Sequence, residues 1–125
     1  MLKALHFNNQ GLIPAVIQDA KSKQVLTLCY LNAAALKKSL ATGTVYVFRR
    51  SLNRLMLKGE TSGHIQLIRQ VAADCEGQSL VIQVRQRVAA CHAGYVTCYF
   101  RRLTGGRLAV VGRRAFDPKR VYRSK

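Results

Sequence analysis

The sequence is poor in several residue types, and each scarcity narrows what the chain can be. It contains no tryptophan, only 2 prolines, and only 5 acidic residues against 21 lysines and arginines, which gives a formal charge of +16. No apolar run is long enough to span a bilayer, and residues 1–8 lack the continuous apolar core of a signal peptide. We therefore expect a cytoplasmic protein whose cysteines are reduced.

What is present is sufficient for one globular domain over residues 1–125, because 49% of the chain is hydrophobic. The positive charge is concentrated in a basic C-terminal segment, residues 101–125, which holds nine bases and one acid. The electrostatic field of so much positive charge attracts polyanions, including nucleic acid and phosphorylated substrates. A solvated basic face explains the charge equally well, and no nucleic-acid-binding motif is visible.

Short β-rich segments surround one helical segment. We expect strands at 12–18, 25–31, 45–48, 55–57, 65–71, 80–84, 97–103 and 108–111. Because proline cannot donate to a ladder, Pro14 predicts that the first strand lies at a sheet edge or begins after it. Cys29 lies mid-strand among apolar residues and is expected to be a core thiol. The pattern predicts an α+β, mostly β fold, with a curled mixed or antiparallel sheet and one main helix.

The expected helix covers residues 33–40. Leu36 and Leu40 are four residues apart and should share its buried face, whereas Ser39 should face solvent. Its expected caps are Asn32 and Gly43.

Three cysteines carry the strongest chemical signal. Cys91 is followed directly by His92, and Cys98 lies seven residues after Cys91. Cys75 lies upstream, between two acids. Thiolates are preferred zinc ligands, and a site with three protein ligands leaves a position for water. Zinc lowers the pKa of that water to about 7. A histidine beside such a site is a candidate general base. Buried apolar cysteines or disulfides are the alternative explanation.

A second signal is the loop from Lys58 to His64, in which two glycines bracket Thr61 and Ser62. Backbone N–H groups and hydroxyls in such a loop can bind a phosphate, and Lys58 with the nearby Arg50 would add charged donors. Most loops of this composition are simply turns, so the signal is weak when it is taken alone.

Together these motifs resemble the phosphoribosyl-AMP cyclohydrolase family, the third enzyme of histidine biosynthesis. The resemblance covers almost the whole chain, and the loop combined with the closing cysteine motif is specific. Its segments are 11–19, 25–32, Arg50-Ser51, Lys58 to Gly63, Asp74-Cys75, Cys91-His92-x-Gly94-x-x-Thr97-Cys98 and 116–122.

The resemblance implies an intertwined homodimer with zinc shared between subunits. Cys75 of one subunit and Cys91 and Cys98 of the other would bind the zinc. Magnesium would be bound by the acidic motif Asp74, Glu76 and Gln78. The implied reaction is hydrolysis of the adenine ring of phosphoribosyl-AMP between N1 and C6, with His92 moving the proton. The implied substrate-binding residues are Arg50, Ser51, Lys58, Thr61, Ser62 and Gly63.

The chain departs from the family pattern at several positions. Gln78 stands where the family has a third aspartate, and a neutral amide is a poorer magnesium ligand, so the magnesium site is expected to be weak or lost. Thr97 replaces the usual serine, and Arg49, Met56 and His64 are also unusual. Two alternatives stay open. One is a basic paralogue with structural zinc that binds nucleic acid or another polyanion, and the other is a zinc hydrolase for another N-ribosyl purine.

Overall fold

The computed structural model describes residues 4–58, 65–86 and 97–111. A four-stranded sheet forms its centre, in the order β2-β1-β6-β5. Its strands are β1 (Ile13–Asp19), β2 (Val25–Leu31), β5 (Gln66–Ala73) and β6 (Leu80–Gln86). β1 pairs parallel with β6 and antiparallel with β2, so the sheet is mixed. This confirms the expected fold class.

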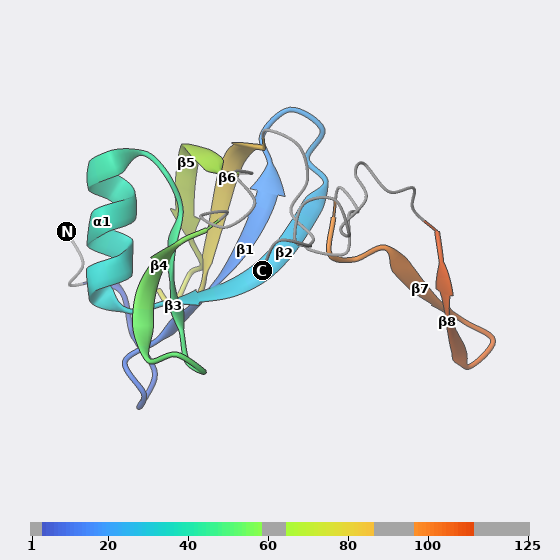
Figure 1. Cartoon of the computed structure of the whole chain (residues 1–125), viewed down its shortest axis with the longest axis horizontal. Helices are drawn as coiled ribbons and strands as arrows, with labels where there is room; N and C mark the ends of the chain where they lie inside the picture. Colours follow the sequence, from blue (N-terminus) through green and yellow to red (C-terminus); the bar gives the residue numbers. More distant parts are fainter. Residues whose placement is uncertain (1–3, 59–64, 87–96, 112–125) are drawn as a thin grey trace, which may run out of the picture.

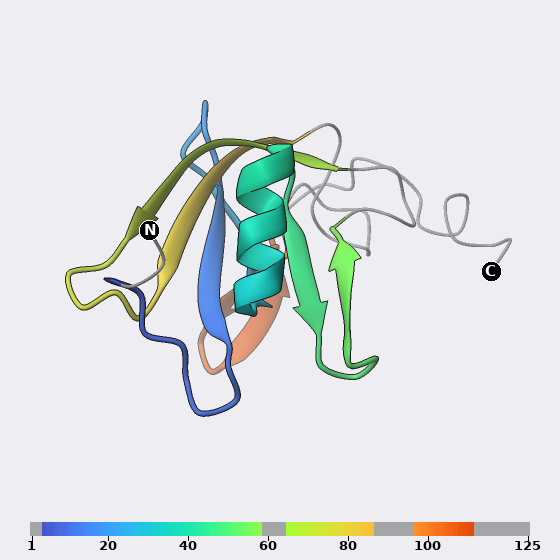
Figure 2. The same ribbon diagram turned by 90° about the vertical axis from the view of Figure 1, so that its left-hand side faces the viewer.

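One face of the sheet forms the core. Ile13, Ala15 and Ile17 of β1 are fully buried, and they alternate with partly buried residues, as the period of two in a strand requires. Ile82 and Val84 of β6 are buried on the same side. The helix α1 (Ala33–Thr42) packs beside β2, with β3 (Tyr46–Arg49) and β4 (Arg54–Leu57) alongside it (Figures 1 and 2).

The helix begins and ends where its capping residues predict. The Asn32 side chain accepts a hydrogen bond from the Ala35 N–H at 2.8 Å, and Gly43 adopts a left-handed conformation after the last turn. The predicted buried face is confirmed at Leu36, which is buried, but it is wrong at Leu40 and Ser39. Ser39 is buried and Leu40 is 38% exposed. The Ser39 hydroxyl donates to the Ala35 carbonyl at 2.8 Å and accepts from the Tyr46 N–H at 2.8 Å, so it joins the helix to β3.

Two strand predictions are also corrected. β1 lies inside the sheet and begins at Ile13, although Pro14 predicted an edge strand or a later start. The ladder with β6 begins only at Ala15, so the missing N–H of Pro14 removes no hydrogen bond from it. The strand expected over 97–103 begins only at Arg101, because Thr97 and Cys98 are bonded to β2 instead.

A separate hairpin, β7 (Arg101–Thr104) with β8 (Arg107–Val110), projects beyond β2 on the side away from α1 and β5 (Figure 1). Every residue of both strands is exposed. Within the described part of the chain, no helix is long and apolar enough to cross a membrane.

Candidate metal and active site

The acidic motif forms the turn between β5 and β6, and Asp74 holds this turn together. Its Oδ1 atom accepts hydrogen bonds from the N–H groups of Glu76 at 3.0 Å and Gln78 at 2.9 Å. Its Oδ2 atom accepts from the Ser79 hydroxyl at 2.6 Å. The Ser79 bond, aided by these backbone donors, lowers the pKa of Asp74 below its ordinary value. The carboxylate is therefore ionised and already engaged by the turn.

Cys75 is the next residue, and the turn leaves it exposed. Gly77 closes the turn from the other side with a positive φ of 66°. A Cβ at this position would overlap the carbonyl oxygen of Ala4, and the Gly77 carbonyl accepts a hydrogen bond from the His6 N–H at 2.7 Å. The turn is thus fixed by its own carboxylate and by the N-terminal segment, and it presents the Cys75 thiol to solvent.

The closing motif is attached to β2 through Thr97. The buried Thr97 hydroxyl lies 2.6 Å from the Val25 carbonyl oxygen and 3.0 Å from that of Leu26, and it accepts from the Tyr99 N–H at 3.0 Å. The Cys98 N–H donates to the Leu26 carbonyl at 2.6 Å. These contacts hold Cys98, which is half-buried, beside the first residues of β2. A serine hydroxyl could make the same bonds, so the threonine preserves the anchor.

Cys75 and Cys98 lie at opposite ends of the four-stranded sheet. By register, the first residues of β2 are level with Ile17 and Gln18 of β1. The Cys75 turn lies beyond the pair formed by Ala73 and Leu80, at the end where Leu80 is level with Ala15. Neighbouring strands lie about 4.8 Å apart, and a strand rises about 3.3 Å per residue. From these values, the distance between the two cysteines is on the order of 15 Å. Two thiolates on one zinc lie only about 4 Å apart.

Two of the expected substrate-binding residues approach β2. Arg50 lies in the turn between β3 and β4, and its guanidinium stacks on the Tyr30 ring at 4.7 Å from the centroid. Lys58 follows β4, and its N–H donates to the Val45 carbonyl at 2.9 Å. Ser51 is exposed in the same turn as Arg50. The Arg50 stacking is a contact that the spacing of the sequence did not predict.

Cys29 is the core thiol that was expected. Its sulfur lies 3.7 Å from the Ala15 carbonyl oxygen, and the residue packs against the buried core. Burial raises the pKa of Cys29 to about 11, and the positive charge of Lys58 opposes that shift. The thiol is therefore held in its protonated form within the packed core.

The remaining predicted residues, Thr61, Ser62, Gly63, Cys91 and His92, lie outside the described residues. Within ranges 4–58, 65–86 and 97–111, no three His, Cys, Asp or Glu side chains are grouped closely enough to hold a metal ion. The described part of one chain thus contributes two separate cysteines, Cys75 and Cys98, and no complete metal site.

Comparison with known proteins decides the family. The sequence model of the phosphoribosyl-AMP cyclohydrolase family matches residues 27–100, which is more than half of the chain. This chain belongs to the phosphoribosyl-AMP cyclohydrolase family. The match begins within β2 and ends just after Cys98, so it contains both the acidic turn and the closing motif.

Individual relatives agree with this assignment. The chain is 44% identical to the phosphoribosyl-AMP cyclohydrolase of Pelotomaculum thermopropionicum, over 97% of this chain and 95% of that protein. It is 47% identical to the same enzyme of Desulfotalea psychrophila, over 92% and 91%. It is also 46% identical to the histidine biosynthesis bifunctional protein HisIE of Thermoanaerobacter pseudethanolicus, of which it spans 58%. The predictions of this family and of an enzyme are confirmed.

Proposed function

We propose that this chain is a zinc-dependent hydrolase that opens the adenine ring of phosphoribosyl-AMP, at the third step of histidine biosynthesis. In the reaction, the oxygen of water forms a bond to C6, the bond between C6 and N1 breaks, and N1 receives a proton. The observation that carries the proposal is the family match across residues 27–100, which includes the acidic turn and the closing cysteine motif.

The three cysteines of the motifs are the proposed zinc ligands, shared across a homodimer: Cys75 from one subunit and Cys91 with Cys98 from the other. When bound, zinc supplies an activated water near neutral pH. The fit is supported by chemistry and topology. The Cys75 thiol is exposed, Cys98 is held by its backbone, and the sheet separates the two within one chain. A second subunit is the simplest means of bringing them together.

The exposed hairpin gives independent support for a homodimer. Leu103 and Leu108 are cross-strand partners and are 72% and 57% exposed. Val110, on the same face, is 58% exposed. Arg101, the partner of Val110, shares this face. An isolated two-stranded hairpin is marginally stable in water, so these exposed apolar side chains favour a cover. We propose that the cover is the second subunit.

Magnesium fits the acidic turn poorly. An ionised carboxylate offers roughly four positions at which it can accept a hydrogen bond. In Asp74, three of these positions are already taken by donors of the turn. Gln78 adds only a neutral amide, so Glu76 is the one other carboxylate of the motif, and magnesium demands near-ideal geometry from its ligands. We therefore propose that Asp74 serves the turn and that activity depends only weakly on magnesium.

The remaining proposed roles are proton transfer and binding of the substrate's phosphates and ribose. His92 is the proposed proton carrier, which takes a proton from water and delivers one to the ring nitrogen. Arg50 and Lys58, with Ser51, Thr61, Ser62 and Gly63, are the proposed contacts of the phosphates and ribose. Arg50 is pre-oriented for this by its stacking on Tyr30, because a guanidinium on an aromatic ring keeps its donors free for phosphate. The proposed compartment is the cytoplasm, where thiol ligands stay reduced.

The test is turnover of phosphoribosyl-AMP by purified protein loaded with zinc, with and without magnesium. Cys91→Ser should lose both bound zinc and activity, because one of three ligands is removed. Cys29→Ser is the matched control, since it makes the same atomic change at a thiol outside the proposed site, and it should keep both. Full activity of Cys91→Ser would refute the zinc assignment, and inactivity of the zinc-loaded wild-type dimer would refute the proposed reaction.

A further inference from the structure

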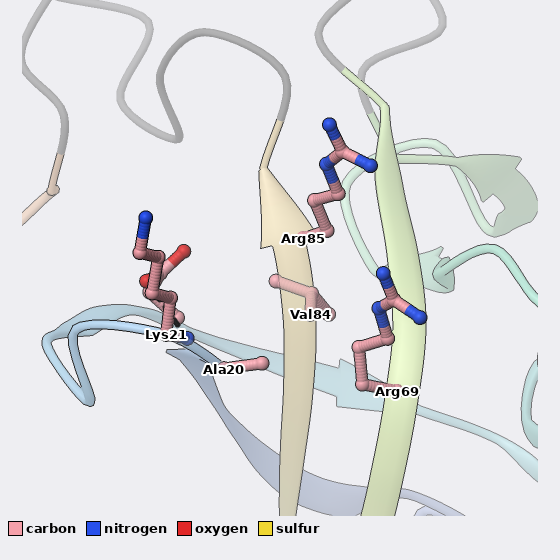
Figure 3. Close-up of a pocket in the computed structure, with 6 residues that line it drawn as sticks. Ala20, Lys21, Arg69, Val84 and Arg85 are labelled. Atoms are coloured by element: carbon pink, nitrogen blue, oxygen red, sulfur yellow. Dashed lines mark hydrogen bonds between the residues drawn. The ribbon is translucent and has the colours of Figure 1, made fainter.

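Three cationic side chains line one open pocket of about 460 Å³ at the end of the sheet opposite the Asp74 turn. They are Lys21, Arg69 and Arg85, and the pocket is also lined by Asp19, Ala20 and Val84 (Figure 3). None of the residues that the family resemblance implicates in zinc, magnesium or substrate binding lines it among the described residues. The pocket is therefore a second candidate site.

The pairing of β1 with β6 brings Lys21 and Arg85 to the same end of the sheet. Asp19 is level with Val84 in the parallel ladder, and the Ala20 N–H donates to the Val84 carbonyl at 2.9 Å. The chain then turns at Lys21, so its side chain stands next to the strand that carries Arg85. Residues that are distant in the sequence thus share one end of the sheet.

A β-bulge adds Arg69 to this group. In the ladder between β5 and β6, Ile68 pairs with Val84 and Gln70 pairs with Gln83, so Arg69 is the extra residue. Ile68 packs against the core, whereas Arg69 is exposed. A bulge redirects the side chain it carries, and here the guanidinium of Arg69 points the same way as that of Arg85 (Figure 3).

Among the described residues, one carboxylate shares the pocket with the three positive charges. The one carboxylate in the pocket, Asp19, accepts hydrogen bonds at its Oδ2 atom from the N–H groups of Lys21 at 3.1 Å and Ser22 at 2.7 Å. Within the described ranges, neither arginine nor Lys21 forms an ion pair with an acidic side chain. Among the described lining residues, the pocket therefore holds an excess of positive charge.

We propose that this pocket binds the phosphate group of a small phosphomonoester of mononucleotide size. Guanidinium groups match the geometry of phosphate oxygens and can bind them through paired hydrogen bonds. The pocket falls within the roughly 300–1,000 Å³ typical of small-molecule sites. A single hollow with clustered donors favours a compact anion over a nucleic-acid strand, which needs a track of contacts. The proposal does not depend on the proposed reaction.

Calorimetric titration with AMP and with inorganic phosphate, at about 0.15 M salt to screen the general field, tests the pocket. The double variant Arg69→Gln and Arg85→Gln should bind AMP roughly tenfold more weakly, because two charged hydrogen-bond donors are lost. The control Lys37→Gln and Arg54→Gln removes the same charge from exposed positions elsewhere and should change the affinity by less than about twofold. Thermal melts should show both variants folded.

Equal weakening in the two double variants would overturn the proposal, because the anion would then respond only to net charge. A loss of binding to a single-stranded oligonucleotide without any loss for AMP or phosphate would overturn it in favour of a nucleic-acid surface. Steady-state kinetics of the pocket variant with phosphoribosyl-AMP then identify which molecule carries the bound phosphate. A raised KM for phosphoribosyl-AMP at unchanged kcat in the pocket variant would assign it to the substrate. An unchanged KM, with the AMP affinity reduced, would assign it to a separate ligand.

Discussion

The β1–β2 pair and the β7–β8 hairpin share an antiparallel pairing and reach opposite outcomes. β1 and β2 are mostly apolar, whereas β7 and β8 carry Leu103, Leu108 and Val110 beside three arginines. β1 buries Ile13, Ala15 and Ile17 completely, whereas Leu103 and Leu108 are 72% and 57% exposed. The difference is the presence of a cover, because β1 has α1 and the central core on one face and the hairpin has neither. Apolar alternation in a sequence thus predicts a strand, but it does not say whether the same chain supplies the burial.

The largest expected effect is in the central sheet. Ile82→Ala removes a fully buried side chain from the core and should lower the free energy of unfolding by about 2–5 kcal/mol. Val81→Ala, on the opposite face of the same strand where the residue is 38% exposed, should cost less than about 1 kcal/mol. Chemical denaturation at fixed protein concentration measures both, and equal losses would contradict the assignment of one buried face.

The hairpin should respond through association. Leu103→Ser should raise the dimer dissociation constant by at least about tenfold, since a buried leucine contributes roughly 1.5–3 kcal/mol to an apolar contact. Leu52→Ser, at an exposed leucine in the turn between β3 and β4, is the control and should leave the dimer intact. Analytical ultracentrifugation over a dilution series gives both values. A Leu103→Ser protein that dimerises like the wild type would remove the hairpin from the interface.

The smallest expected effect concerns Asp19, in the turn that joins β1 to β2. The hydrogen bond from the Ser22 N–H is the main cause that lowers the pKa of Asp19. A carboxyl whose folded-state pKa is lowered stabilises the fold above its unfolded value of about 3.9, and that contribution is lost as pH falls through the folded value. Asp19→Asn should therefore melt below the wild type at pH 7, and the gap should close in acid. An equal gap at both pH values would show that the charge contributes nothing.

Local chemistry explains which parts of the fold the sequence predicted. Asn32 and Gly43 define the ends of α1 because caps act within a few residues. The prediction for the buried face of α1 was right for Leu36 and wrong for Leu40 and Ser39. The i and i+4 spacing selects a stripe without saying which neighbour covers it, and β3 binds Ser39. Pro14 could sit inside the sheet because the ladder with β6 begins one residue later, which is a property of register.

As with the fold, the local parts of the site were predictable from the sequence, and the parts that depend on distant residues were not. The acidic turn was predicted from its residues. The hydrogen bonds that the turn makes to the Asp74 carboxylate, however, are seen only in the structure. The pocket of Lys21, Arg69 and Arg85 was missed because its residues are far apart in the sequence and one of them is placed by a bulge. No pattern along the chain signals such a bulge.

The central claim is that the zinc site is built from two subunits, and a mixed dimer tests it most directly. One subunit carries Cys75→Ser and the other Cys98→Ser, and the heterodimer is isolated through two different affinity tags. If the site is shared, one of the two sites keeps all three cysteines, so the heterodimer should bind one zinc and recover about half of the wild-type activity, while each mutant homodimer has none. If each site is built within one chain, both sites are damaged, and a heterodimer without zinc or activity would contradict the account.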